Sequence, residues 1–212
     1  MRRSLYVFGL LLVILCAALF MIPRTTQAIT YGFVDSNNTY SNVGAFIVKT
    51  SSGQIFPICS GTLITPNVFL TASHCTSFFT NSLAPEGDQA YVSFDGSIPF
   101  GDLTSNKTKL IPVSFVVTNP NYNQSQSDSG DIGVLILASR VRSATPATLI
   151  QCGLLDQLSA QNGLKQAVFT NVGYGVQNRV VGGGVPFFQD INPVPRMFSF
   201  SSFNSLNGGY LR

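Results

Sequence analysis

Six short apolar runs between residues 43 and 138 constrain the fold of this chain more than any other feature. The runs are VGAFIVKT, QIFPICSGTLI, VFLTAS, AYVSF, LIPVSFVV and DIGVLILA. Each has the length of a β-strand and is bounded by Gly, Pro, Asn or Ser, which are the residues that form turns. No 3.6-residue repeat of useful length competes with this pattern. The runs therefore predict an all-β fold, built as a small antiparallel barrel or sandwich.

The remainder of the chain contains fewer strand signals. Residues 140–163 are typical of a connecting segment, and only QAVFTNVGYGV and RMFSFSSF have clear strand character after it. Residues 176–196 contain three consecutive glycines together with prolines. This composition predicts a long mobile loop.

The N-terminus has the pattern of a targeting segment. Two arginines precede an unbroken apolar run over residues 5–22, and Thr26-Gln27-Ala28 offers small residues to a signal peptidase. Residues 1–28 are therefore predicted to be a signal peptide, and the protein is predicted to be secreted. The apolar run is close to the minimum length of a membrane span, so an uncleaved N-terminal anchor is the alternative. Contact with a membrane is expected only in that case.

The charge distribution argues against a nucleic-acid partner. The whole chain has a formal charge of +3, but three of its arginines lie within residues 1–28, and the rest of the chain carries no net charge. No basic stripe or Lys/Arg-rich helix remains to contact phosphates.

The candidate catalytic residues are found in motifs that begin with the only histidine of the sequence, His74. It is followed directly by Cys75, and Cys59 lies 16 positions before that cysteine. The stretch CSGTLITPNVFLTASHC, residues 59–75, resembles the histidine motif of trypsin/chymotrypsin-like serine proteases. DIGVLIL, which begins at Asp131, is similar to the strand that carries the aspartate of that family. A weaker third match is NVGYGV, residues 171–176.

This resemblance implies a trypsin-like double antiparallel β-barrel. The first barrel would cover residues 29–140, and residues 141–212 would form the crossing between barrels and an incomplete second barrel. By the same resemblance, His74 is the general base and Asp131 orients it. Cys59 and Cys75 are expected to form a disulfide that fixes the histidine loop. The implied substrate is a protein or peptide, and no cofactor is expected.

One simpler explanation of these residues remains open. The two cysteines could simply cross-link a hairpin. Asp131 could cap a strand, and the glycines near residue 174 could form a turn. A metal site gains no support from the sequence, because the cysteines and the histidine have neither CxxC nor HxxxH spacing.

One part of the family's catalytic machinery has no counterpart among these 212 residues. The family's nucleophile lies in a Gly-Asp-Ser-Gly-Gly-Pro loop, and this stretch does not occur in the sequence. Asp128-Ser129-Gly130 lacks the flanking glycines, and Ser129 is tethered to Asp131 on the wrong side of the imidazole ring. We therefore expect a C-terminally truncated protease that is inactive alone.

Two further alternatives follow from the missing nucleophile. The chain could be a non-catalytic secreted binding protein that keeps a protease scaffold. A separate C-terminal fragment could complete the second barrel in trans. Cys152, the cysteine left over outside the apolar run, is expected either to pair with a cysteine outside these residues or to be a free buried thiol.

Overall fold

The computed structural model describes residues 32–99, 101–102, 108–123, 129–175, 178–180, 187–189, 192–204, 206–207 and 210–211. The predictions for residues 1–28, including the apolar run over 5–22, lie outside these ranges. Within the described ranges, no helix combines the length and the apolar character that crossing a bilayer requires.

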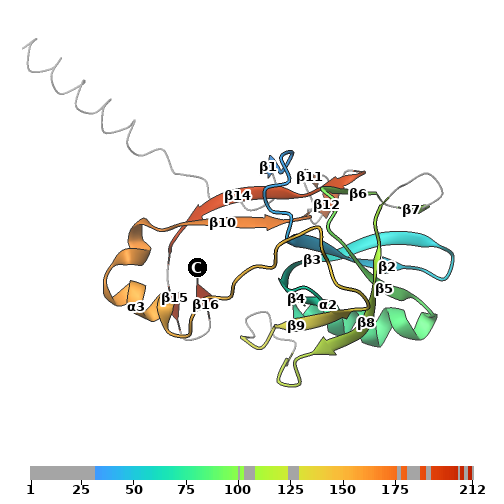
Figure 1. Cartoon of the computed structure of the whole chain (residues 1–212), viewed down its shortest axis with the longest axis horizontal. Coiled ribbons are helices and arrows are strands. Elements are labelled where there is room, and N and C mark those ends of the chain that lie inside the picture. The colour runs from blue at the N-terminus through green and yellow to red at the C-terminus, as the bar shows by residue number, and fades with distance from the viewer. Residues whose placement is uncertain are drawn as a thin grey trace, which may run out of the picture.

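A closed antiparallel barrel forms the first half of the protein (Figure 1). Its strands follow the order β2-β5-β8-β9-β4-β3, and β3 pairs back onto β2. The strands are β2 (Val43–Lys49), β3 (Gln54–Thr65), β4 (Val68–Thr71), β5 (Gln89–Ser93), β8 (Ile111–Thr118) and β9 (Gly133–Leu137). Each one overlaps an apolar run identified in the sequence. The prediction of an all-β, trypsin-like barrel is confirmed.

Burial alternates along two of the barrel strands, β4 and β9. In β9 the first, third and fifth residues are buried, and they include Leu135 and Leu137. This period of two is expected when one face of a strand points into a core. Phe69 is fully buried and packs against Phe94 at a ring-centroid distance of 5.8 Å. A Cβ at Gly61 would lie 2.4 Å from the Phe69 ring, so β3 passes close to this aromatic core only because it has glycine there.

Two short helices were not expected from the sequence. Helix α2 (Ser73–Phe78) follows β4 directly and continues as a π-helical turn over Phe79–Leu83. Helix α3 (Leu154–Ala160) lies within the connecting segment. Helices of six or seven residues are too short to show an amphipathic repeat, so the sequence pattern could not reveal them.

Two strands of the second half of the chain form a three-stranded antiparallel sheet with β1 of the first half, in the order β1-β14-β10. Its strands are β1 (Phe33–Val34), β10 (Val168–Gly173) and β14 (Met197–Ser202). Figure 1 shows this sheet beside the barrel, with α3 beyond the end that faces away from the barrel.

The prediction that residues 176–196 form one loop is wrong in part. β11 (Asn178–Val180) pairs with β12 (Phe187–Gln189), and β13 (Val194–Pro195) pairs with β6 (Ser97–Ile98) from the first half. The remaining short strands are β7 (Gly101–Asp102), β15 (Leu206–Asn207) and β16 (Tyr210–Leu211). Strand pairing, between neighbours for β11 and β12 and with a distant strand for β13, therefore forms within a segment whose local composition is typical of a loop.

A buried ion pair joins the two halves. Arg196 is completely buried, and its Nε donates to Asp35 Oδ2 at 2.9 Å. The other guanidinium N–H groups donate to the carbonyls of Val43 and Phe94 and to the side chains of Tyr174 and Asn38. A buried charge requires this kind of pairing and hydrogen bonding, because burial removes its hydration. The pair therefore couples the segment before β2 to the segment before β14.

Asp35 is expected to make the stability of the fold depend on acidic pH. Burial raises the pKa of its carboxyl, but hydrogen bonds from Tyr40 N–H, Arg196 and Thr39 N–H outweigh burial and hold the pKa below the ordinary 3.8. A lowered folded-state pKa stabilises the fold above the unfolded-state pKa, and this contribution is lost as pH falls through the folded-state value. We expect the urea midpoint to decrease from about pH 5 downward. Asp35→Asn should flatten that decrease, and an unchanged slope in this variant would contradict the assignment.

Candidate functional site

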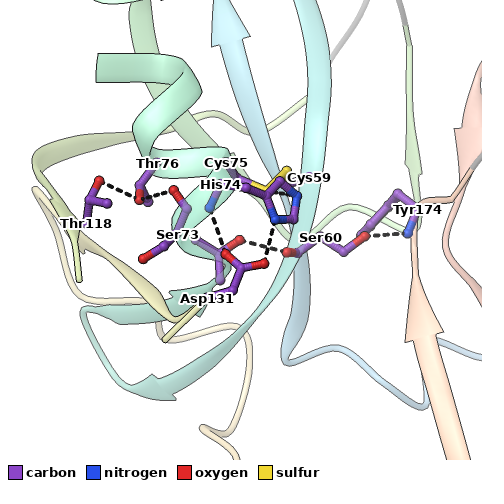
Figure 2. Close-up of a disulfide and its surroundings, with 10 residues drawn as sticks. Cys59, Ser60, Ser73, His74, Cys75, Thr76, Thr118, Asp131 and Tyr174 are labelled. Atoms are coloured by element: carbon purple, nitrogen blue, oxygen red, sulfur yellow. Dashed lines mark hydrogen bonds and ion pairs between the residues drawn. A yellow bond between two sulfur atoms is a disulfide. The ribbon is translucent and has the colours of Figure 1, made fainter. Parts of the chain in front are cut away.

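β4, α2 and β9 bring His74 and Asp131 together. Thr71 of β4 pairs with Gly133 of β9. His74 is the second residue of α2, and Asp131 lies two residues before β9. The distance from His74 Nδ1 to Asp131 Oδ2 is 2.8 Å, and the backbone N–H of His74 donates to Asp131 Oδ1 at 2.7 Å. Figure 2 shows the carboxylate facing the histidine with both oxygens engaged.

Asp131 determines which ring nitrogen of His74 carries the proton. Burial raises the pKa of Asp131, but hydrogen bonds from the His74 side chain and backbone outweigh burial and hold the pKa below 3.8. The carboxylate is therefore ionised at neutral pH and can only accept hydrogen bonds. Nδ1 must then be the protonated nitrogen, and Nε2 of the neutral ring keeps a lone pair.

The ring of His74 lies at the surface. The His74 side chain is 59% exposed and the Asp131 side chain is 31% exposed. A group placed beside Nε2 can therefore transfer a proton to it, which is the chemistry of a general base. In the part of the chain that the structure describes, no hydrogen bond joins a serine hydroxyl to this nitrogen.

A disulfide between Cys59 and Cys75 joins β3 to α2, as the resemblance implied. The Cys75 Sγ lies 3.2 Å from His74 Nε2, so the sulfur atoms and Asp131 lie at different edges of the imidazole (Figure 2). Cys152 has a free thiol and is exposed. The alternative that it is a buried thiol is therefore wrong, because its segment lies at the surface just before α3.

Ser73 supports this site and was not identified from the sequence. Its side chain is buried, and its Oγ donates to the carbonyl of Ile132 at 2.7 Å and accepts from the backbone N–H of Asn119 at 3.0 Å. These contacts hold the start of α2 against the residue that follows Asp131. The partners lie 59 and 46 positions away, so a serine beside a histidine gives no local signal of this role.

The NVGYGV stretch also packs beside the site. The backbone N–H of Tyr174 donates to Ser60 Oγ at 2.8 Å, directly after Cys59 (Figure 2). Its hydroxyl donates to the carbonyl of Asp95 at 2.6 Å. Burial raises the pKa of Tyr174 to about 12, so the hydroxyl keeps its proton and remains a donor. The segment thus ties the second half of the chain to the strand that carries the disulfide.

Gly133 allows β9 to pass close to α2. A Cβ at this position would lie 2.8 Å from the Ala72 carbonyl and 2.8 Å from the Thr76 side chain. Gly133→Ala is therefore expected to displace α2 and to cost about 1–3 kcal/mol, measured by urea unfolding. Gly96→Ala is the matched control, since a Cβ there meets nothing within 4 Å. Equal losses in the two variants would contradict the close-packing argument.

Comparisons with known proteins agree on one family. The family model described as Trypsin matches residues 33–179. Chymotrypsin-like elastase family member 1 from Homo sapiens is 26% identical over 140 residues, which is 66% of this chain and 49% of that protein. The Bos taurus protein of the same name is 29% identical over 136 residues, or 64% of this chain and 46% of the relative. The chain thus spans about half the length of these relatives.

Solved structures agree on the fold. A structure of HL collagenase superposes with a TM-score of 0.53 at 13% identity, covering 83% of this chain and 64% of the other. A structure of GrC gives a TM-score of 0.51 at 18% identity, covering 83% and 66%. The family match includes β2 to β10 and therefore both His74 and Asp131. The chain belongs to the trypsin family.

Proposed function

We propose that His74 and Asp131 are the general base and the orienting acid of a serine endopeptidase site. His74 Nε2 takes the proton of a serine hydroxyl as that oxygen attacks the carbonyl carbon of a peptide bond, and Asp131 stabilises the resulting imidazolium. The substrate is a protein or peptide. The observation that carries this proposal is the pair of contacts at 2.7 and 2.8 Å, by which one carboxylate fixes both the backbone and the ring of His74.

The nucleophile is proposed to come from residues other than these 212, on the same polypeptide or on a second one. The sequence holds no Gly-Asp-Ser-Gly-Gly-Pro stretch. In the family, the backbone N–H groups of that loop also stabilise the oxyanion, and one such donor contributes roughly 100- to 1,000-fold to kcat. Both contributions are missing from the 212 residues, which are therefore expected to be inactive alone.

Action outside the cell is the setting that we propose for this activity. Residues 1–28 have the pattern of a signal peptide, and the Cys59–Cys75 disulfide suits an oxidising compartment. N-terminal sequencing of exported protein should begin at Ile29. A chain that keeps residues 5–22 would instead support the membrane anchor.

A serine-reactive fluorophosphonate probe tests the proposal. The 212-residue chain should be neither labelled nor able to cleave an unstructured protein, and His74→Ala should behave identically. Labelling that disappears in His74→Ala would contradict the missing nucleophile, because a serine of this chain would then complete the site.

The transcript beyond the codon of Arg212 separates the protease from the binding protein. A Gly-Asp-Ser-Gly-Gly-Pro stretch encoded there in any reading frame would support the endopeptidase. A folded, unlabelled chain whose transcript lacks this stretch would instead favour a binding protein on the same scaffold.

A further inference from the structure

Asp131 lies in a tight turn just before β9. The backbone N–H of Ile132 donates to the carbonyl of Gly130 at 2.7 Å. A hydrogen bond between residues i+2 and i closes a turn of three residues, and Asp131 is the central one. This hydrogen bond does not attach the turn to the rest of the barrel. The direction of the Asp131 carboxylate therefore depends on the contacts that hold the two ends of the turn.

Side chains from two other segments hold those ends. Asn119, which follows β8, donates from Nδ2 to the carbonyl of Gly130 at 2.9 Å. Ser73, the first residue of α2, donates from Oγ to the carbonyl of Ile132 at 2.7 Å. The residues before and after Asp131 are thus each held through their carbonyl oxygen. Together, Asn119 and Ser73 form a clamp on the turn.

The two residues of the clamp are joined to each other. The backbone N–H of Asn119 donates to Ser73 Oγ at 3.0 Å, so this hydroxyl both accepts and donates. The side-chain oxygen of Asn119 accepts from the backbone N–H of Asn121 at 3.0 Å, which leaves the amide N–H₂ to face Gly130. Ser73 is completely buried, and its hydroxyl would carry a desolvation cost without these partners. The clamp is therefore one connected unit.

Helix α2 and strand β8 anchor the clamp. Thr76 is completely buried, and its Oγ1 donates to the carbonyl of Ser73 at 3.1 Å. The same oxygen lies 2.8 Å from Thr118 Oγ1 at the end of β8, so Thr118 is the donor of that pair. Figure 2 shows these contacts running from Thr118 through Thr76 to Ser73. The clamp thus connects the turn at Asp131 to the helix that carries His74 and to the strand that pairs with β9.

We propose that Asn119 is a positioning residue for Asp131, acting through the Gly130 carbonyl and through Ser73. This inference rests on the proposed function, in which Asp131 orients His74. The contacts of Asp131 with the backbone and the ring of His74, at 2.7 and 2.8 Å, require the turn to keep its place. In a catalytic site, a displacement of about 1 Å can lower the rate roughly 100-fold. Among the described residues, Asn119 has no hydrogen bond to His74 or Asp131, so it acts through the turn.

The clamp belongs to the first half of the chain. Its hydrogen bonds to the turn and between its two residues join only residues 73–132. The barrel is therefore expected to align Asp131 with His74 without the segment that supplies the nucleophile. The 212-residue chain is thus a suitable sample for a test that needs no proteolytic activity.

NMR of the His74 ring in the 212-residue chain tests the positioning role. In the wild type we expect the neutral ring to carry its proton on Nδ1, with a low-field ¹H signal from the hydrogen bond to Asp131. Asn119→Ala should move this signal upfield and speed its exchange with water about tenfold, because the turn loses a hydrogen bond. Asn121→Ala is the matched control, since Asn121 is exposed and contacts Asn119 through its backbone N–H, and it should keep the wild-type signal.

Two further variants separate the clamp from general loosening of the segment after β8. Asn119→Asp keeps the acceptor for the Asn121 N–H but has no N–H to donate to Gly130, so it should change the His74 signal as Asn119→Ala does. Ser73→Ala should act in the same direction. Combined with Asn119→Ala, it should speed the exchange by less than the product of the two single factors, as expected for coupled residues.

Urea unfolding of each variant shows whether a change at His74 is local. A wild-type His74 signal in Asn119→Ala, or a change that Asn121→Ala reproduces, would overturn the positioning role and leave the proposed function intact. A lower urea midpoint with an unchanged His74 signal would also overturn it, because Asn119 would then serve stability alone. A wild-type neutral ring without a proton on Nδ1 would contradict the proposed function itself, and the positioning role with it.

Discussion

Replacing Arg196 with methionine is expected to destabilise the fold by about 3–5 kcal/mol. The change leaves the carboxylate of Asp35, whose side chain is 1% exposed, without its buried partner. It also removes the donors to the carbonyls of Val43 and Phe94. Urea unfolding followed by circular dichroism measures the loss. Arg142→Met, at an exposed position, is the matched control and should stay within about 0.5 kcal/mol of wild type.

The combined variant Asp35→Asn with Arg196→Met shows whether the ion pair itself is responsible. Once the arginine is absent, a neutral amide is easier to bury than an unpaired carboxylate. The double variant should therefore lose less stability than the sum of the two single losses, which is the signature of coupled residues. Additive losses would contradict a direct interaction and would assign the effect of Arg196→Met to packing alone.

Removing the disulfide through Cys59→Ala together with Cys75→Ala is expected to cost about 3 kcal/mol. The bond closes a loop of 16 residues, and its loss allows the unfolded chain many more conformations. The free energy of unfolding, again from urea titration, measures the effect. Cys152→Ala is the matched control, because this cysteine is free and exposed, and it should change stability by less than about 0.5 kcal/mol. A similar cost in both variants would show that the disulfide does not stabilise the fold.

The strands of the barrel and the cluster around His74 could be predicted from the sequence. Strands such as β9 alternate between core and surface residues, and turn residues separate them, so the pattern is local. The histidine motif and the aspartate at DIGVLIL are likewise continuous stretches of sequence. Features that are determined by residues close together in the sequence can therefore be predicted without the structure.

Features that depend on distant residues could not be predicted. Arg196 and Asp35 are 161 positions apart, and no sequence pattern relates a single arginine to a single aspartate across that distance. The buried contacts of Ser73 and the pairing of β13 with β6 also join residues that lie far apart in the sequence, so no local pattern predicts them.

Measuring which ring nitrogen of His74 carries the proton tests most directly whether Asp131 prepares this residue as a general base. His74 is the only histidine, so ¹⁵N and ¹H NMR signals of an imidazole can be assigned to it without ambiguity. In the neutral form of the ring we expect Nδ1 to be protonated and hydrogen-bonded and Nε2 to be unprotonated. Asp131→Asn should abolish this preference, because an amide N–H₂ can face the ring in place of an acceptor. A wild-type ring protonated on Nε2, or identical spectra in wild type and Asp131→Asn, would contradict the account.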